Sequence, residues 1–447
     1  MDFLIRNHKR IIWLIVLAAF IVAVSYAFYF RIQPIVDAKS YDEMAWNLVQ
    51  GGEYSVSDIY RPGPGYSFFL AAIYFIFGHS YEAVWIIQSL LFALMALFAF
   101  LISRLIFDDD RAIIVGFVAS ILLAISPDLI TVNAMLMTET FTIFMSMVAT
   151  YFLMKYIKDG SWPWLILTSV FVSLAALGRA NVVLLVIPLM LLFVIRKNWR
   201  HGFIGLAIIF LMLTPWTVRN YLAYGIFKPF NSAGGGLLAV GNHPGASGEL
   251  EEVKWPDEYN KMSQIDFDKA ARGDAIDFIK HHPFEFAQIT LKRVSVYLSL
   301  SRPTGFWFHL DGLAQQLTLA TSALHTATLF ILGLLGAVLI VKRYLRKNLG
   351  QTFKKRWAEF TMAPAFYLLL IAIMMPLSIL LIVVETRYRY PLYPFLAILG
   401  GYGFVELVTN FRQNWRSLLG VSGLLIVNTI IDVVRNWSKI FGRLINL

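Results

Sequence analysis

Ionisable residues lie at the ends of several apolar segments in this sequence, and these are the places where chemistry could occur. Asp37, Tyr41 and Asp42 follow the first long apolar segment, and Arg61 stands in the same connection, in front of the turn-rich stretch 62–65. A charge at the edge of a membrane costs free energy, so each of these residues is by default a candidate for a functional site. A carboxylate placed there can take a proton from a hydroxyl group, and a guanidinium group can bind a phosphate through two parallel hydrogen bonds.

The same residue types recur at the ends of later apolar segments. They are Thr138-Glu139, Arg179, Arg219-Asn220, Glu385, Arg387 and Arg389. Short outer turns of membrane proteins are usually poor in arginine, because positive charge accumulates on the cytoplasmic side. These arginines therefore call for an anion, and a phosphate at the level of the lipid headgroups fits because guanidinium is permanently charged.

The composition is that of a polytopic membrane protein. Of the 447 residues, 58% are hydrophobic and only 15% are charged, and the mean hydropathy is +0.66. The net charge of +10 does not indicate nucleic-acid binding, because the basic residues cluster in short loops between apolar segments. The chain has no cysteine, which excludes disulfides, thiolate metal sites and cysteine nucleophiles.

The second apolar segment decides on which side of the membrane all later loops lie. Residues 11–30 can cross the bilayer at about 1.5 Å per residue, and Lys9 and Arg10 in front of them place the N-terminus in the cytoplasm. Residues 64–77 are too few for an ordinary crossing, so we predict that they stay in or on the outer leaflet. With this choice the basic loops are cytoplasmic, and all the candidates above share the extracytoplasmic face.

The expected fold is an all-α polytopic bundle of about ten or eleven transmembrane helices, with amphipathic juxtamembrane helices and one large external loop. Residues 1–221 form an N-terminal transmembrane catalytic module that includes a first external loop, 31–80. Residues 222–313 form the large external loop with interfacial helices, one of them at 284–300, and residues 314–447 the C-terminal transmembrane helices.

The last apolar segment, 417–434, is ambiguous. It contains Asp432, and the tail behind it is basic. The segment therefore either turns back within the membrane or places a basic tail on the outer face, against the charge rule.

The order of the motifs resembles that of the GT-C membrane glycosyltransferases. The shared pattern is Asp37-x-x-x-Tyr41, Arg61-Pro62-Gly63-Pro64-Gly65-Tyr66, Thr138-Glu139, Thr214-Pro215-Trp216-x-x-Arg219-Asn220, Gly241-Asn242-His243-Pro244 and Arg387-Tyr388-Arg389-Tyr390-Pro391. It is most similar to the branch that contains bacterial relatives of protein O-mannosyltransferases and the lipid A aminoarabinose transferase. The resemblance covers most of the chain, up to residue 408.

This resemblance implies an enzyme of the cytoplasmic membrane that moves a sugar from a polyprenyl-phosphate carrier to an acceptor hydroxyl at the extracytoplasmic face, with inversion at the anomeric carbon. It implies Asp37 as the general base and Glu139 as a second catalytic residue that positions the acceptor or the base. Arg61 and Arg219 are the expected ligands of the lipid phosphate, with Arg387 as a third. Further substrate-binding candidates are Tyr41, Asp42, Asn220, Asn242, His243 and Glu385. The acceptor can be a glycan, a lipid or a protein.

Each assignment has a structural alternative. Asp37 could cap the N-terminus of a helix, and Glu139 could complement a helix dipole. The arginines could extend to lipid headgroups or pair with Glu385.

We expect no metal ion and no cofactor other than the lipid-linked sugar itself, because the eight histidines are scattered without a His-Glu-x-x-His arrangement. The sequence also lacks a Walker A motif, which argues against a nucleotide-sugar donor. Two other functions stay open. A transporter or flippase of lipid-linked glycans would need ionisable residues near the middle of several spans, and an O-antigen ligase or polymerase would use a pyrophosphate-linked donor.

Overall fold

A computed structural model describes residues 2–52, 54, 63–107, 110–230, 234–302, 308–346 and 352–437. Every regular element within these ranges is a helix. The first part of the chain forms α1 (Asp2–Arg6), α2 (His8–Phe30), α3 (Asp37–Val49), α4 (Gly65–Phe77), α5 (Tyr81–Ile106), α6 (Arg111–Ala124), α7 (Pro127–Asn133), α8 (Thr138–Asp159), α9 (Trp162–Gly178), η1 (Ala180–Leu185), α10 (Val186–Arg196) and α11 (Trp199–Tyr224). The second part forms α12 (Gly235–Gly241), η2 (Tyr259–Lys261), α13 (Gln264–His281), α14 (Pro283–Leu298), α15 (Gly312–Arg346), α16 (Phe353–Met362), α17 (Pro364–Ile382), η3 (Thr386–Leu392), α18 (Tyr393–Thr409) and α19 (Phe411–Arg435).

Among the described residues, eight helical segments are long and apolar enough to cross a membrane. They are α2, α5, α8, α11, α15, α17, the segment made of η3 and α18, and α19. Helices α6 and α7 count as a ninth if they form one span, bent by 57°. The bend lies at Pro127, which has no backbone N–H to continue the helix, while Ser126 caps the new one. The predicted all-α membrane fold is confirmed. The ten or eleven crossings expected from the sequence require that the shorter α9 and η1–α10 also cross, and this number stays a prediction.

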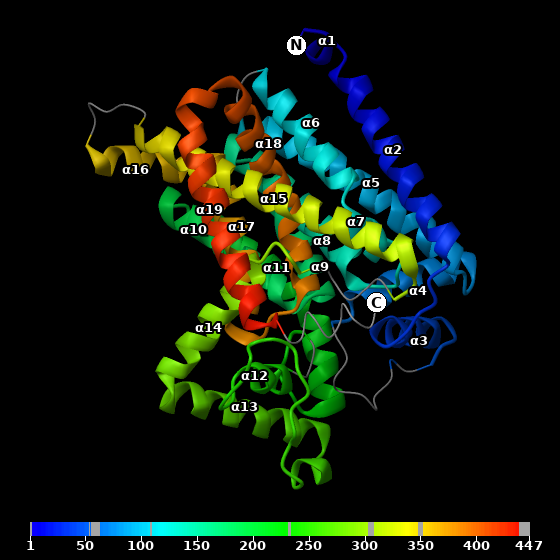
Figure 1. The fold of residues 1–447 in the computed structure, drawn as a ribbon. Helices are drawn as coiled ribbons and strands as arrows, with labels where there is room; N and C mark the ends of the chain where they lie inside the picture. The colour runs from blue at the N-terminus through cyan, green and yellow to red at the C-terminus, as the bar shows by residue number, and fades with distance from the viewer. Residues whose placement is uncertain are drawn as a thin grey trace.

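Helix α4 has 13 residues and is not among the helices long enough to cross. Its first residue, Gly65, lies against Gly178 at the end of α9, and its last residue is followed by the short turn into α5. Figure 1 shows α3 and α4 together at the end of the bundle opposite the N-terminus. This arrangement agrees with the prediction that residues 64–77 do not traverse the membrane.

The segment between α11 and α15 forms a small helical layer on the same end of the bundle as α3 and α4 (Figure 1). Helices α12 and α13 share a small core of Ala239, Tyr259, Ala271 and Ala275. The predicted helix at 284–300 is α14, and its Phe284 and Leu291 are exposed, as expected of an interfacial helix.

Close helix packing at the centre of the bundle depends on glycine. A Cβ atom on Gly336 of α15 would lie 1.9 Å from the carbonyl oxygen of Leu399 in α18, and one on Gly403 would lie 2.5 Å from that of Leu332. Small residues let membrane helices approach closely, so these two positions fix how α15 lies on α18.

Helix α19 settles the ambiguity of the last apolar segment. It runs from the end of the bundle near the N-terminus back to the end that carries α14 (Figure 1). Asn428 and Arg435, in its second half, both bind Ser295 of α14. The segment therefore traverses the bundle instead of turning back.

Candidate active site

Arg387 lies between two carboxylates that are far from each other in the chain. Its Nη1 is 3.2 Å from Oδ2 of Asp37, at the start of α3, and its Nε is 2.7 Å from Oε2 of Glu385, directly before η3. The first pair joins residues 350 positions apart. The structure thus brings the first external segment and the η3 segment together, as the sequence analysis anticipated from their shared membrane side.

A second ion pair lies next to the first. Glu139, in the first turn of α8, accepts a hydrogen bond from Nη1 of Arg179 at 2.5 Å, and the Glu139 side chain is fully buried. The guanidinium groups of Arg179 and Arg387 lie 5.3 Å and 5.6 Å from the centre of the Tyr388 ring. Both cations therefore contact one aromatic ring, which joins the two ion pairs into one cluster.

The surroundings of Asp37 exclude the helix-cap alternative. The cap position of α3 is taken by Val36, and Asp37 is the first helical residue, without a side-chain cap bond. Val36 has a φ of +48°, which is strained for a β-branched residue. The Asp37 side chain is 47% exposed, so the carboxylate is accessible from outside the bundle.

Tyr41 lies one turn further along α3, on the same helix face as Asp37. It is buried, and its ring packs edge-on against Tyr66. Burial, reinforced by the charges of Glu139 and Asp37, raises the pKa of Tyr41 above its ordinary value. The hydroxyl therefore stays protonated and can donate a hydrogen bond into the cluster.

Asp42, expected as a substrate-binding residue, joins α3 to its neighbours. The carboxylate is buried and accepts three hydrogen bonds, from Tyr74 at 2.6 Å, His79 at 2.8 Å and Tyr81 at 2.7 Å. These donors come from α4, the following turn and the start of α5. Asp42 therefore holds α3 on the bundle, and its role in substrate binding stays a prediction.

Asn220 also has a structural role. It is buried at the end of α11, and its amide donates to the carbonyls of Lys228 and Phe230 at 2.9 Å. It closes the loop after α11. The expectation that it contacts a substrate stays a prediction.

Arg219 is surrounded by aromatic rings. Its guanidinium carbon lies 5.4, 4.9 and 4.9 Å from the ring centres of Tyr54, Trp216 and Tyr224. It donates to the Tyr54 carbonyl and to Asn220, and within the described residues no carboxylate pairs with it. Its charge is thus oriented by rings, with no anion from the described part of the protein to neutralise it.

The turn at 241–244 lies within the end layer and contributes to its anchoring. Asn242 is buried, donates to Leu238 and accepts from Arg293 of α14, which also binds the Gly241 carbonyl. Burial lowers the pKa of Arg293 to about 10. The substrate-binding role expected of Asn242 stays a prediction. His243 is partly exposed, with Nε2 3.7 Å from Glu251.

One predicted site residue cannot be placed, and three residues near the site were not assigned a role from the sequence. Arg61 lies outside the described residues. Arg179 stood out in the sequence as an arginine in an outer turn, but nothing there assigned it to Glu139. Tyr388 gave no signal beyond its place in the Arg-Tyr-Arg-Tyr motif. Asp128, buried in α7 and bound by Ser322 and Tyr393, was hidden inside an apolar segment.

Within the described residues no group of three or more His, Asp or Glu side chains could hold a metal ion. The absence of a metal requirement stays a prediction.

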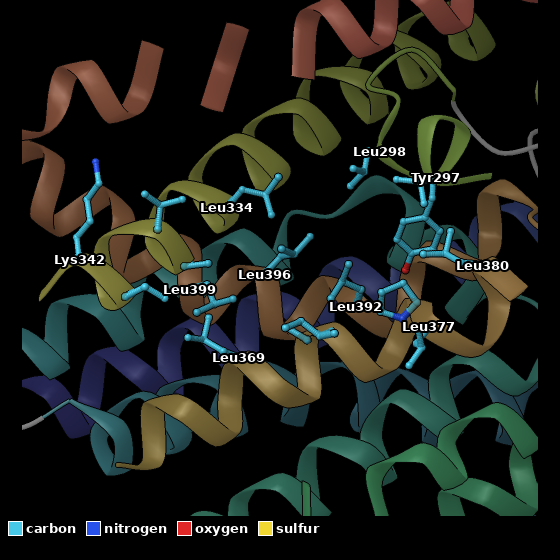
Figure 2. A pocket seen from close by; sticks show the side chains of 17 residues that line it. Tyr297, Leu298, Leu334, Lys342, Leu369, Leu377, Leu380, Leu392, Leu396 and Leu399 are labelled. Carbon is cyan, nitrogen blue, oxygen red and sulfur yellow. The ribbon is translucent and has the colours of Figure 1, made fainter. Parts of the chain in front are cut away.

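An apolar groove of about 690 Å³ lies between α14, α15, α17 and α18. Figure 2 shows Tyr297, Leu380 and Leu392 toward one end and Lys342 at the other, with leucines such as Leu396 and Leu399 between them. Leu392 is the last residue of η3, the element that also carries Arg387. One end of the groove is therefore built on the same short helix as the ionic cluster.

Part of the chain matches a family of known description. Residues 61–218 match the family described as dolichyl-phosphate-mannose-protein mannosyltransferase. No protein of curated function matches the sequence.

Solved structures match the fold along almost the whole chain. The Archaeoglobus fulgidus oligosaccharyltransferase in complex with Zn and sulfate superposes with a TM-score of 0.50 and 14% identity, over 94% of this chain and 52% of that one. Its apo form gives 0.50 and 13%, over 93% and 55%. ArnT from Cupriavidus metallidurans bound to undecaprenyl phosphate gives 0.49 and 16%, over 93% and 62%.

These identities establish the fold alone, and the chain spans little more than half of the length of the structures that it matches. The predicted resemblance is therefore confirmed as a GT-C fold, through the match to the oligosaccharyltransferase, together with the family match over residues 61–218.

Proposed function

The chain combines a GT-C fold with a domain of the dolichyl-phosphate-mannose-protein mannosyltransferase family, and from this premise we propose that it is an inverting glycosyltransferase. It takes a sugar from a polyprenyl-phosphate carrier and transfers it to an acceptor hydroxyl. The relative whose structure holds undecaprenyl phosphate supports this class of donor.

One observation carries the choice of the base. Of the four carboxylates at this end of the bundle that the sequence proposed, Asp37 is the most exposed, at 47% against 34% for Glu385. Glu139 is fully buried against Arg179, and Asp42 accepts three hydrogen bonds. A general base must reach the proton that it removes. Asp37 therefore takes the acceptor proton as the acceptor oxygen attacks the anomeric carbon, and the bond from that carbon to the phosphate oxygen breaks.

The lipid phosphate leaves with an additional negative charge, which preorganised cations stabilise. Arg387 supplies one such cation beside Asp37, and the Glu139–Arg179 pair holds Tyr388 and thereby the Arg387 guanidinium in place. Arg219 is the second phosphate ligand, because its aromatic surroundings leave its charge available to an anion. Arg61 keeps the phosphate role proposed from its motif.

The apolar groove supports a polyprenyl donor in particular. Its lining is almost entirely aliphatic, and it includes Leu392, the last residue of η3, which also carries Arg387. A prenyl chain whose phosphate lies at Arg387 can extend directly into this groove, where burial of apolar surface contributes binding free energy.

The orientation follows from charge. Arg343, Arg346 and the basic residues at the start of α16 lie at the far end of the bundle from α3 (Figure 1). By the positive-inside rule that end is cytoplasmic, so we place the cluster on the extracytoplasmic face of the cytoplasmic membrane.

The test uses purified protein with synthetic undecaprenyl-monophosphate sugars and measures release of undecaprenyl phosphate. We expect turnover in the native protein and loss of at least about 100-fold in Asp37→Asn, as expected for removal of a general base. Glu43→Gln, an exposed change on the same helix, is the matched control and should keep full activity.

Two results would contradict the proposal. Turnover only with a pyrophosphate-linked donor would favour the ligase or polymerase, and movement of the intact lipid-linked sugar between leaflets without release would favour the flippase. Unchanged turnover in Asp37→Asn would remove Asp37 as the base.

A further inference from the structure

Two segments outside the active-site cluster hold the helical turn that carries Arg387. The first is 299–302, which follows α14. Arg389 is buried, and its Nη1 donates to the carbonyl of Ser299 at 2.6 Å while its Nη2 donates to the carbonyl of Arg302. Arg389 lies two residues after Arg387, so the position of η3 depends on where residues 299–302 are held.

The second segment pairs with the chain just in front of η3. The N–H of Val384 donates to Gly248 at 3.0 Å, and the N–H of Leu250 donates to the carbonyl of Val384 at 3.2 Å. This short bridge places Glu249 opposite Val384. Since Glu385 comes next, the bridge fixes the approach of the chain to both Glu385 and Arg387.

Both segments meet in one side chain, Arg302. Its Nε and Nη2 bind the two oxygens of Asp432 at 2.7 and 2.8 Å, and its Nη1 binds Glu249. Asp432 is fully buried although it lies on α19, a helix of which little is buried. A bidentate pair of this kind fixes orientation as well as distance.

We propose that Arg302 and Asp432 are positioning residues for the active site. They join α19 to the segments 248–250 and 299–302, and through these to the two sides of Arg387. A carboxylate on a membrane helix is costly, and this function explains why Asp432 stands in an otherwise apolar part of α19. The inference rests on the proposed function only for its catalytic consequence, because the mechanical link can be measured by itself.

The absence of cysteine allows a direct measurement. Cysteines introduced at the exposed positions Val36 and Glu252 can carry spin labels, and the distance distribution between them reports how the 248–250 segment lies relative to the start of α3. We expect one narrow distribution in the otherwise native protein and a shifted or broadened one in Asp432→Asn and in Arg302→Gln. Arg412→Gln removes an exposed cation near the start of the same helix, away from Asp432, and should leave the distribution unchanged.

Activity provides the second measurement. Asp432→Asn should raise KM for undecaprenyl-monophosphate sugar and Kd for undecaprenyl phosphate by about 3- to 30-fold, the range of coupling through a positioning network. Asp432→Glu should restore most of the loss, which a change in overall stability alone would not do. If Asp432→Asn does not fold, Glu249→Gln, on the outer side of the same network, takes its place.

An unchanged distance distribution in a folded Asp432→Asn or Glu249→Gln protein would overturn the inference, whatever its turnover. A native protein without turnover or binding of undecaprenyl phosphate would instead contradict the proposed function. In that case a changed distribution would still establish the mechanical link.

Discussion

Asp37 and Glu139 belong to one cluster, yet their surroundings give them different roles. Asp37 is half exposed and shares Arg387 with Glu385, whereas Glu139 is enclosed and has Arg179 as a close partner. An exposed carboxylate can exchange its partner for a substrate at small cost. A buried carboxylate cannot leave its partner at small cost, because both charges would then be buried without compensation for their lost hydration.

At the residue scale, this difference predicts opposite effects of two amide substitutions. Glu139→Gln should lower the free energy of unfolding by about 3 kcal/mol, because it leaves the Arg179 cation without a counter-charge. Asp37→Asn should change stability by less than about 1 kcal/mol, because its ion pair is partly exposed. The effects on turnover should have the opposite order, with a larger loss in Asp37→Asn than in Glu139→Gln.

Thermal midpoints in detergent, together with carrier release, measure both quantities. If Glu139→Gln were as stable as the native protein, the Glu139–Arg179 ion pair would not contribute to the free energy of unfolding. Glu82→Gln, an exposed carboxylate at the start of α5, serves as the control for adding an amide.

At the scale of elements, α3 depends on one side chain that faces inward. Asp42 accepts hydrogen bonds from three donors on neighbouring elements, and α3 also carries Asp37 and Tyr41. Asp42→Asn would turn an amide NH₂ toward at least one of these donors. We expect a loss of about 1–3 kcal/mol in stability, the cost of an unsatisfied buried polar group.

The same substitution should reduce kcat, because the start of α3 loses its anchor. Asp42→Glu keeps the negative charge but moves the carboxylate, so it reports on geometry. Glu43→Gln removes a neighbouring exposed charge from the same helix and is the control for charge. Full activity with full stability in Asp42→Asn would show that α3 is held by its apolar contacts alone.

The end layer should weaken in acid. Burial alone would raise the pKa of Asp268, but hydrogen bonds from Lys228 and Gly235 outweigh it and lower the pKa below its ordinary value of 3.8. Because the pKa of Asp268 is lower in the folded state, its contribution to stability is complete at pH values above the pKa of the unfolded state. This contribution is lost as the pH falls through the pKa of the folded state.

Hydrogen exchange of α12 and α13 between pH 6 and pH 3 can follow this change. The contribution of Asp268 should be intact at the upper pH and diminish below about 4, and Asp268→Asn should lack that part of the pH dependence. Equal pH dependence in the native protein and in Asp268→Asn would place the acid-sensitive group elsewhere.

At the scale of the whole molecule, the bundle places an ionic cluster at one end and an apolar groove between its helices, with η3 common to both. Charge on one face and hydrocarbon contact along the helices match the two parts of a polyprenyl-phosphate donor. The layer of α12–α14 lies on the same end of the bundle as α3, which carries Asp37 (Figure 1).

Filling the groove should discriminate between donors by chain length. Ala372→Trp introduces a large ring into the lining, and should raise KM for an undecaprenyl donor by about 10-fold, since lost apolar burial of roughly 1.4 kcal/mol has that effect. A donor with a very short prenyl chain should be little affected. Leu381→Trp, an exposed position outside the lining, is the control.

An equal rise in KM for short and long donors would contradict this use of the groove. It would place the prenyl chain along another surface of the bundle.

The sequence by itself determined the membrane class, the spans and the group of charges from which the site is made. These properties follow from local hydropathy and charge, which the chain order already contains. Helix α4 is an example, since its length alone excluded it as an ordinary crossing. The motif order was also enough to predict the GT-C fold.

The tertiary structure alone decided which of those charges are open to a substrate. Asp37 and Asp42 lie five positions apart on the same helix. They differ in their surroundings, because three hydrogen-bond donors enclose Asp42 and leave Asp37 exposed. Arg179 pairs with Glu139, and Asp432 with Arg302, across segments that are distant in the chain. Exposure and hydrogen-bond partners depend on packing between such segments, and no local pattern in the sequence records that packing.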